Sequence, residues 1–103
     1  MQKRTPNVYI LNKGCHDFST AEQYGNIVFC TEGFLPKYQT SQMVRELQST
    51  MKDCQPDDYI LLTSLTALCS IACALFSHKH GRLNLLLHGK DGYIERKIIL
   101  PTL

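Results

Sequence analysis

Residues 59–81, YILLTSLTALCSIACALFSHKHG, determine how this 103-residue chain is organised. The first five of them, Tyr59 to Thr63, are β-favouring and all but the last are apolar, which predicts a buried strand. A polar turn with Thr63, Ser64 and Thr66 follows, and an almost wholly apolar helix is predicted over residues 65–77. Such a strand–turn–helix connection leaves backbone N–H groups unpaired beyond the carboxyl end of the strand. The segment therefore predicts one buried strand, one buried helix and an edge that a ligand can reach.

The remaining chain supplies further strands and helices in alternation. Apolar runs predict strands over residues 8–11, 27–30, 83–87 and 93–100. Helices are predicted over residues 20–24, with Ser19 and Glu22 as a capping box, and over residues 40–54, where apolar residues recur every three or four positions. The turn before the last strand is short enough for a hairpin, so that strand is expected to run antiparallel.

This order of elements predicts an α/β fold. We expect a small doubly wound, mostly parallel Rossmann-like sheet of about five strands, with an antiparallel C-terminal edge strand. The whole chain, residues 1–103, is expected to form a single α/β domain, since its length suits one hydrophobic core.

Composition excludes several classes of function. A net charge of +2 and a pI near 8.3 are too mild to indicate nucleic-acid binding, and the start of the chain, Gln2 with the basic residues Lys3 and Arg4, is expected to form a solvated tail. No apolar run reaches the roughly 18 residues of a membrane span. The five cysteines are odd in number and lack C-x-x-C spacing, which predicts reduced thiols in a cytoplasm. We expect no metal and no cofactor.

Polar residues follow each of the four strands that are predicted to be parallel. In chain order they are Asn12, Lys13 and Gly14 with His16 and Asp17; then Thr31, Glu32 and Gly33; then Thr63, Ser64 and Thr66; and finally His88 and Lys90. Ligands of doubly wound folds bind outside the carboxyl ends of the parallel strands. We therefore predict that these residues form one ligand-binding rim.

The residue types at this rim indicate the class of ligand. Lys13, Lys90 and the free N–H groups after Ser64 favour an anion such as a phosphate. Glu32 or Asp17 could accept hydrogen bonds from ribose-like hydroxyls. The predicted ligand is therefore small, anionic and nucleotide-derived. In the alternative interpretation the same residues only end strands, as polar residues and glycines do in every α/β protein. Neither G-x-G-x-x-G nor a P-loop is present, so a standard dinucleotide or triphosphate pocket is not supported.

Catalysis is the less favoured interpretation of these residues. Cys15 lies beside His16, but nucleophile–base pairs are usually assembled from separate segments. His16 with Asp17, or His88 with Glu32, could perform acid–base chemistry if they converge. A small nucleotide hydrolase or transferase therefore stays an alternative, and no catalytic residue is assigned.

The predicted helix over residues 65–77 also indicates a partner. It has almost no polar face, so it is expected to be buried on all sides. The sheet can cover one side, and a second copy of the chain could cover the other, which predicts a homo-oligomer. A host protein is the alternative occupant. The basic residues His78, Lys79 and His80 suit the carboxyl end of the helix.

Four segments together resemble a known group of proteins. They are ILNKGCHDFSTAEQYG, VFCTEG, DDYILLTSL and HKHGRLNLLL. As a set they resemble small phage-encoded α/β proteins with an I-L-N-K-x-x-H-D segment, a T-E-G after the second strand and a D-D-Y before the third. The resemblance covers residues 8–90. The recurring residues of that group correspond here to Asn12, Lys13, His16, Asp17, Thr31, Glu32, Gly33, Asp57 and Asp58.

The resemblance implies that the protein is phage-encoded and acts in the host cytoplasm. Small phage proteins commonly act against host systems, and one strategy is to sequester a nucleotide-derived immune signal without chemistry. By analogy, we expect a phage-type protein that captures a small anionic ligand. The alternative from another class is a host-takeover protein that acts through protein–protein contact.

Overall fold

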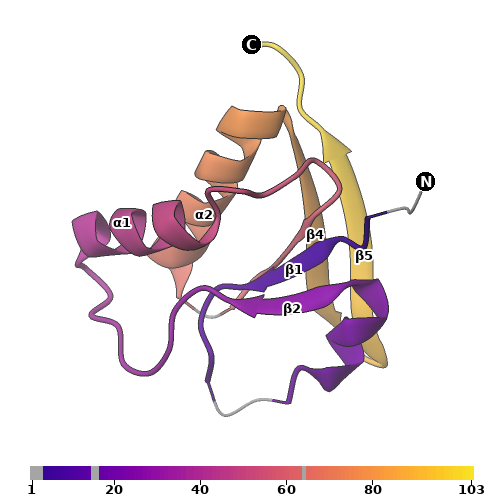
Figure 1. Ribbon diagram of the computed structural model, residues 1–103, viewed down its shortest axis with the longest axis horizontal. Helices are drawn as coiled ribbons and strands as arrows, with labels where there is room; N and C mark the ends of the chain where they lie inside the picture. The colour runs from indigo at the N-terminus through magenta and orange to yellow at the C-terminus, as the bar shows by residue number, and fades with distance from the viewer. Residues whose placement is uncertain (1–3, 15–16, 64) are drawn as a thin grey trace.

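The computed structural model describes residues 4–14, 17–63 and 65–103. Its sheet contains β1 (Asn7–Ile10), β2 (Asn26–Phe29), β3 (Tyr59–Leu61), β4 (Arg82–Gly89) and β5 (Gly92–Ile99). The strand order is β2-β1-β3-β4-β5 (Figure 1). The first four strands are parallel to their neighbours, and β5 runs antiparallel to β4. The predicted mostly parallel sheet with an antiparallel C-terminal edge is confirmed.

Helices cover both faces of this sheet. The helices α1 (Thr40–Thr50) and α2 (Thr66–His80) pack on one face, and the short 3₁₀ helix η1 (Ser19–Tyr24) packs on the other (Figure 1). Side chains of β1 alternate between the two cores, because successive residues of a strand point to opposite faces. Tyr9 and Leu11 join the α1–α2 core, whereas Val8 and Ile10 join the η1 core. The doubly wound arrangement is thereby confirmed.

The short helix begins differently from the prediction. The capping box of Ser19 and Glu22 is wrong, since the helix has no side-chain cap of that kind. Instead, the backbone N–H of Ser19 donates to the Asp17 carboxylate at 2.9 Å, which is an Asx-type turn. The helix ends at Gly25, where a Cβ atom would lie 2.2 Å from the carbonyl oxygen of Pro6. Only glycine therefore lets η1 turn into β2 so close to the chain entering β1.

The apolar helix extends to His80 and ends at Gly81, whose positive φ of 68° and N–H bond to Ser77 form the expected left-handed cap. Its buried residues are Leu68, Ala72 and Phe76. It is not buried on all sides, because a stripe of small and polar residues four apart stays exposed. This stripe consists of Thr66, Ser70, Ala74 and His78. Self-contact through residues 65–77 stays a prediction.

The amino edge of the sheet is organised by a buried carboxylate. Asp58 is fully buried and accepts hydrogen bonds from the Arg4 guanidinium at 2.8 and 3.2 Å, and from the backbone N–H groups of Asn7 and Gln55, each at 2.8 Å. The Asp58 contact raises the pKa of Arg4. Arg4 was expected in a solvated tail, and that expectation is wrong. Pairing with a buried carboxylate more than fifty residues away holds it at the sheet.

No helix within the described part of the chain has both the length and the apolar character that a membrane crossing requires. The cysteines at positions 30, 54, 69 and 73 are free thiols. Burial raises the pKa of Cys30 to about 11. That thiol stays protonated at neutral pH and acts as a small apolar side chain of the core.

Candidate functional site

The carboxyl ends of β1 and β2 are tied together by polar side chains. The amide nitrogen of Asn12 donates to the Thr31 hydroxyl at 2.8 Å and to the carbonyl of Gly33 at 3.3 Å. The Thr31 hydroxyl in turn donates to the carbonyl of Leu11 at 2.7 Å. These groups satisfy one another, so Asn12, Thr31 and Gly33 set the backbone at this edge. Their hydrogen bonds fix the geometry of the site, whether or not these residues also contact a ligand.

The next residues on the two strands face solvent. Lys13 and Glu32 form a parallel bridge, and the Lys13 ammonium lies 3.9 Å from the Glu32 carboxylate. Both side chains are more than half exposed, so this ion pair contributes at most about 1 kcal/mol. The same ammonium lies 5.1 Å from the centre of the Phe29 ring, a cation–π distance. Lys13 is thus positioned at the edge by Phe29 but remains available to an anion.

A hollow of about 310 Å³ opens beside these residues, between η1 and β2. We call it the β1–β2 hollow. Its lining residues are Lys13, Gly14, Asp17, Phe18, Ser19, Glu22, Ile27 and Phe29. The volume lies at the lower end of the range for small-molecule sites. Three of the residues predicted from the sequence, Lys13, Gly14 and Asp17, therefore border one cavity.

The β1–β2 hollow combines an apolar floor with a charged border. Phe18 and Phe29 meet edge to face, with ring centres 6.1 Å apart. Asp17 accepts the Ser19 N–H, and this bond holds the pKa of the Asp17 carboxyl below its usual value. Asp17 is therefore ionised at neutral pH. Such a site can stack a planar ring, attract an anion through Lys13 and accept hydrogen bonds at its carboxylates.

The remaining described residues of the prediction do not line the β1–β2 hollow, although Thr63 follows β3, the second neighbour of β1, at the same carboxyl edge. Thr63 is half-buried, and its carbonyl accepts the Cys69 thiol at 3.2 Å; Thr66 is the exposed first residue of α2. His88 packs on Tyr93 with ring centres 5.2 Å apart. Lys90 lines a separate hollow of about 340 Å³ at the tip of the β4–β5 hairpin. His16 and Ser64 lie outside the described residues.

Two intervening strands, β1 and β3, separate the hairpin from the carboxyl end of β2. The register sets Leu86 level with Leu61, so Gly89 and the bridge between Lys13 and Glu32 lie at similar heights along the strands. The strands β2 and β4 are nevertheless three strand spacings apart, or about 14 Å. His88 and Glu32 therefore do not follow neighbouring strands, and acid–base chemistry between them is not supported.

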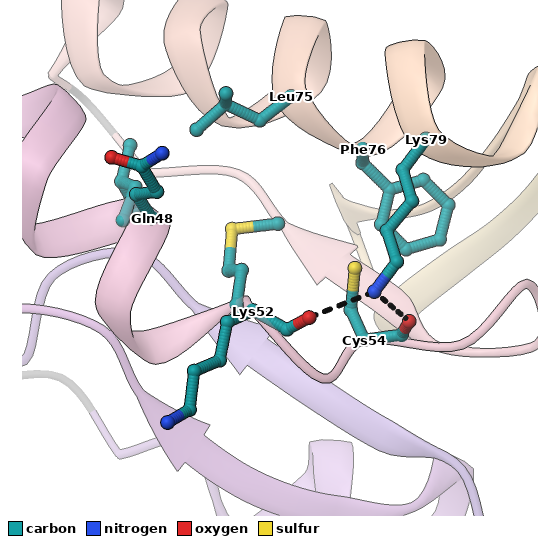
Figure 2. A pocket seen from close by; sticks show the side chains of 8 residues that line it. Gln48, Lys52, Cys54, Leu75, Phe76 and Lys79 are labelled. Carbon is teal, nitrogen blue, oxygen red and sulfur yellow. Dashed lines mark hydrogen bonds between the residues drawn. The ribbon is translucent and has the colours of Figure 1, made fainter.

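Sequence reasoning missed a small apolar pocket of about 130 Å³ between α1 and α2 (Figure 2). It is lined by Leu47, Gln48, Met51, Lys52, Cys54, Leu75, Phe76 and Lys79. The Lys79 ammonium donates to the carbonyls of Lys52 and Cys54 at 2.8 and 2.9 Å, as the dashed lines of Figure 2 show. That charge caps the turn after α1. The spacing of apolar residues along both helices was the available signal, but it does not reveal where their packing leaves a gap.

A cysteine and a histidine meet beside this pocket. The Cys54 sulfur lies 3.3 Å from Nε2 of His80, a distance typical of a nucleophile–base pair. However, the same Nε2 lies 3.0 Å from the Cys54 carbonyl, to which only a protonated nitrogen can donate. Burial also raises the pKa of Cys54. The thiol therefore stays protonated, and the pair serves packing rather than nucleophilic chemistry.

Comparison with known proteins identifies one family. A family model described as "Phage Pam3 gp32-like protein" matches residues 6–98, which contain every helix and strand described above except the last residue of β5. No curated protein and no solved structure matches the chain.

Proposed function

This chain belongs to the family of Phage Pam3 gp32-like proteins, and from that premise we propose that it captures an anionic, nucleotide-derived small molecule in the β1–β2 hollow. Membership confirms the resemblance to phage-encoded proteins that the sequence indicated. The single observation that carries the proposal is the cavity bordered by Lys13, Gly14 and Asp17 at the carboxyl edge of β1 and β2. Ligands of doubly wound folds bind beyond the carboxyl ends of the parallel strands, near the point where the strand order reverses, which here lies between β1 and β3.

The lining favours a particular kind of nucleotide derivative. The Phe29 ring offers a surface for a base, and the Lys13 ammonium lies within reach of a phosphate at the border. Asp17 and Glu22 add two carboxylates that can accept ribose hydroxyls but repel additional negative charge. A ligand with one phosphate, or with a cyclic phosphodiester, therefore fits better than a triphosphate.

Replacing Lys13 with alanine is expected to weaken ligand binding at least tenfold, because a charge-assisted contact to the phosphate is lost. Isothermal titration calorimetry against 3′,5′-cyclic nucleotides, cyclic dinucleotides and ADP-ribose measures this effect. The matched control is Lys90→Ala, which removes the same charge from the hairpin tip and should leave binding unchanged. The proposal fails if no compound of the panel binds, or if the two variants bind with equal affinity.

A protein-binding role is the second candidate, favoured by the loop between β2 and α1. Phe34 is 92% exposed and Tyr38 is 82% exposed, an unusual state for two large aromatic side chains on one short loop. Exposed aromatic residues are frequent anchors of protein interfaces. A host protein could therefore dock on this loop, next to the β1–β2 edge.

Changing Phe34 and Tyr38 together to serine separates the two candidates. If a host protein docks on the loop, a pull-down from host lysate should lose that partner in the double variant, while Lys13→Ala retains it. Unchanged capture by the double variant, with the fold verified by circular dichroism, would contradict docking at this loop. The nucleotide titration of the double variant should match that of the original protein.

A further inference from the structure

The edge strand β5 has only part of the protection that edge strands usually have. It is the last strand of the sheet and pairs with β4 alone, along the right-hand side of the molecule in Figure 1. Natural edge strands avoid self-association by being short, bulged, covered or charged. In contrast, β5 has eight residues and exposes three isoleucines, Ile94, Ile98 and Ile99, the last at 69%. Its charged residues Glu95, Arg96 and Lys97 are of both signs, so they can also attract another strand.

The outward backbone groups of β5 follow from its register with β4. The turn has two residues, Lys90 and Asp91, and Gly89 pairs with Gly92. Alternate pairs of an antiparallel ladder exchange hydrogen bonds, so even-numbered residues of β5 bond to β4. The bond from the Leu100 N–H to the Gly81 carbonyl, 3.1 Å long, follows the same alternation. The N–H and C=O groups of the odd-numbered residues therefore point away from the sheet. These residues are Tyr93, Glu95, Lys97 and Ile99.

We propose that two copies of the chain pair through antiparallel β5 strands, with the two-fold axis at Arg96. This register places Glu95 opposite Lys97 of the second copy, and Lys97 opposite Glu95, on one face of the joined sheet. The outward backbone groups of these residues then meet as hydrogen-bonded pairs. On the other face, Ile94 lies opposite Ile98 of the second copy, so these two exposed isoleucines cover each other, while Ile99 lies opposite Tyr93 on the first face.

Charge selects this register over its neighbours. Each of the three registers with the axis at Glu95, Arg96 or Lys97 sets one pair of like charges opposite each other at the axis. Only the axis at Arg96 adds two pairs of opposite charge, Glu95 with Lys97 of the other copy in both directions. Like charges directly across a strand pair are destabilising, whereas opposite charges stabilise it. If the axis lay between two residues, each residue whose backbone groups bond to β4 would face a residue whose backbone groups point away from the sheet. The hydrogen bonds between the two β5 strands could then not form. The strand is thus self-complementary in one arrangement.

Three groups must adjust when the strands pair. The Glu95 carboxylate accepts the Tyr59 hydroxyl at 2.8 Å and lies 3.8 Å from the Lys97 ammonium of its own strand, so pairing with Lys97 of the second copy competes with these contacts. The Arg96 guanidinium donates to the Glu95 carbonyl at 2.9 Å, and the backbone N–H of Lys97 from the second copy would replace it. The Tyr24 hydroxyl donates to the Tyr93 carbonyl at 3.3 Å, but a carbonyl has a second lone pair for a further donor. Arg96 also lies opposite Arg96 of the second copy at the two-fold axis. This contact between like charges weakens the dimer, so the fraction of dimer should depend on protein concentration.

Sedimentation velocity of the full chain over a range of concentrations tests this pairing. Lys97→Glu places like charges opposite each other twice, so the Kd of the dimer should rise about tenfold. The double variant Glu95→Lys with Lys97→Glu restores opposite charges in exchanged positions and should restore the dimer. Lys90→Glu makes the same charge change outside the paired strands and should leave the Kd unchanged.

Ala74→Arg separates this pairing from self-contact through α2, because Ala74 lies on the exposed stripe of that helix. The β5 pairing predicts that Ala74→Arg dimerises like the original protein. A chain that stays monomeric at all concentrations overturns the proposal, as does a dimer that is lost with Ala74→Arg and unaffected by Lys97→Glu. Thermal unfolding of each variant verifies that a lost dimer does not reflect a lost fold.

Discussion

Replacing Asp58 with alanine is expected to lower the free energy of unfolding by about 3 kcal/mol, a large share of the stability of a small domain. The Asp58 side chain is fully buried and accepts four hydrogen bonds at the amino edge of the sheet. Its removal leaves the N–H groups of Asn7 and Gln55 without their acceptor, and each unpaired group costs about 1–3 kcal/mol. Urea denaturation followed by circular dichroism measures the change as a lower midpoint.

Asn7 begins β1 and Gln55 precedes β3, so this one carboxylate joins the starts of two neighbouring strands. The backbone carbonyl of the same residue accepts the Asn84 amide of β4 at 2.8 Å. Three strands therefore converge on residue 58. The side chain acts at the edge opposite the β1–β2 hollow, so its loss should destabilise the protein without altering the ligand site directly.

Two control variants separate burial from charge. Asp57→Ala removes an exposed carboxylate with a single 2.9 Å contact to Arg4, and it should cost less than about 1 kcal/mol. Asp58→Asn keeps the size but replaces one acceptor oxygen with a donor, so it should not restore stability. If Asp57→Ala and Asp58→Ala destabilise equally, the buried network does not hold the edge.

Much of the fold could be predicted because β1, β2 and β3 are short apolar runs joined by helical segments. A parallel sheet covered on both faces requires such runs, and the hairpin turn requires an antiparallel last strand. The strand order was not predictable, because the lengths of the connections are compatible with several orders. The role of Asp58 was also hidden, since its partner Arg4 is 54 residues away and no local pattern reports so distant an ion pair.

The candidate site could be predicted in part for the same reason. Lys13 and Glu32 follow adjacent parallel strands, so their meeting at one edge is a consequence of topology. His88 and Lys90 were assigned to that edge because they follow the last of the strands predicted to be parallel. The observed strand order places β1 and β3 between β2 and β4, so the hairpin tip lies to one side of the β1–β2 hollow. That strand order is not encoded in the local composition of any one segment.

Replacing Phe76 with alanine is expected to cost about 4 kcal/mol, the largest effect of the variants considered. Phe76 is the largest fully buried side chain, and its ring meets His80 with centres 4.8 Å apart. It also forms one wall of the α1–α2 pocket, beside Cys54 and Lys79 (Figure 2). Truncation to alanine therefore leaves a new cavity next to the existing α1–α2 pocket. The helices α1 and α2 cannot shift far enough to fill both spaces. Urea denaturation at constant slope gives the loss of stability.

The neighbouring residue on α2 provides the control for Phe76. Leu75 lines the same pocket but stays partly exposed, so Leu75→Ala should cost clearly less than Phe76→Ala. Phe76→Leu retains most of the apolar volume and should lose less than about 1.5 kcal/mol. Equal losses for Leu75→Ala and Phe76→Ala would mean that the pocket, rather than the buried ring, limits how tightly α2 packs on the sheet. With Phe76 as the dominant contact, α2 keeps its position on β3 and β4 even though its outer stripe is exposed.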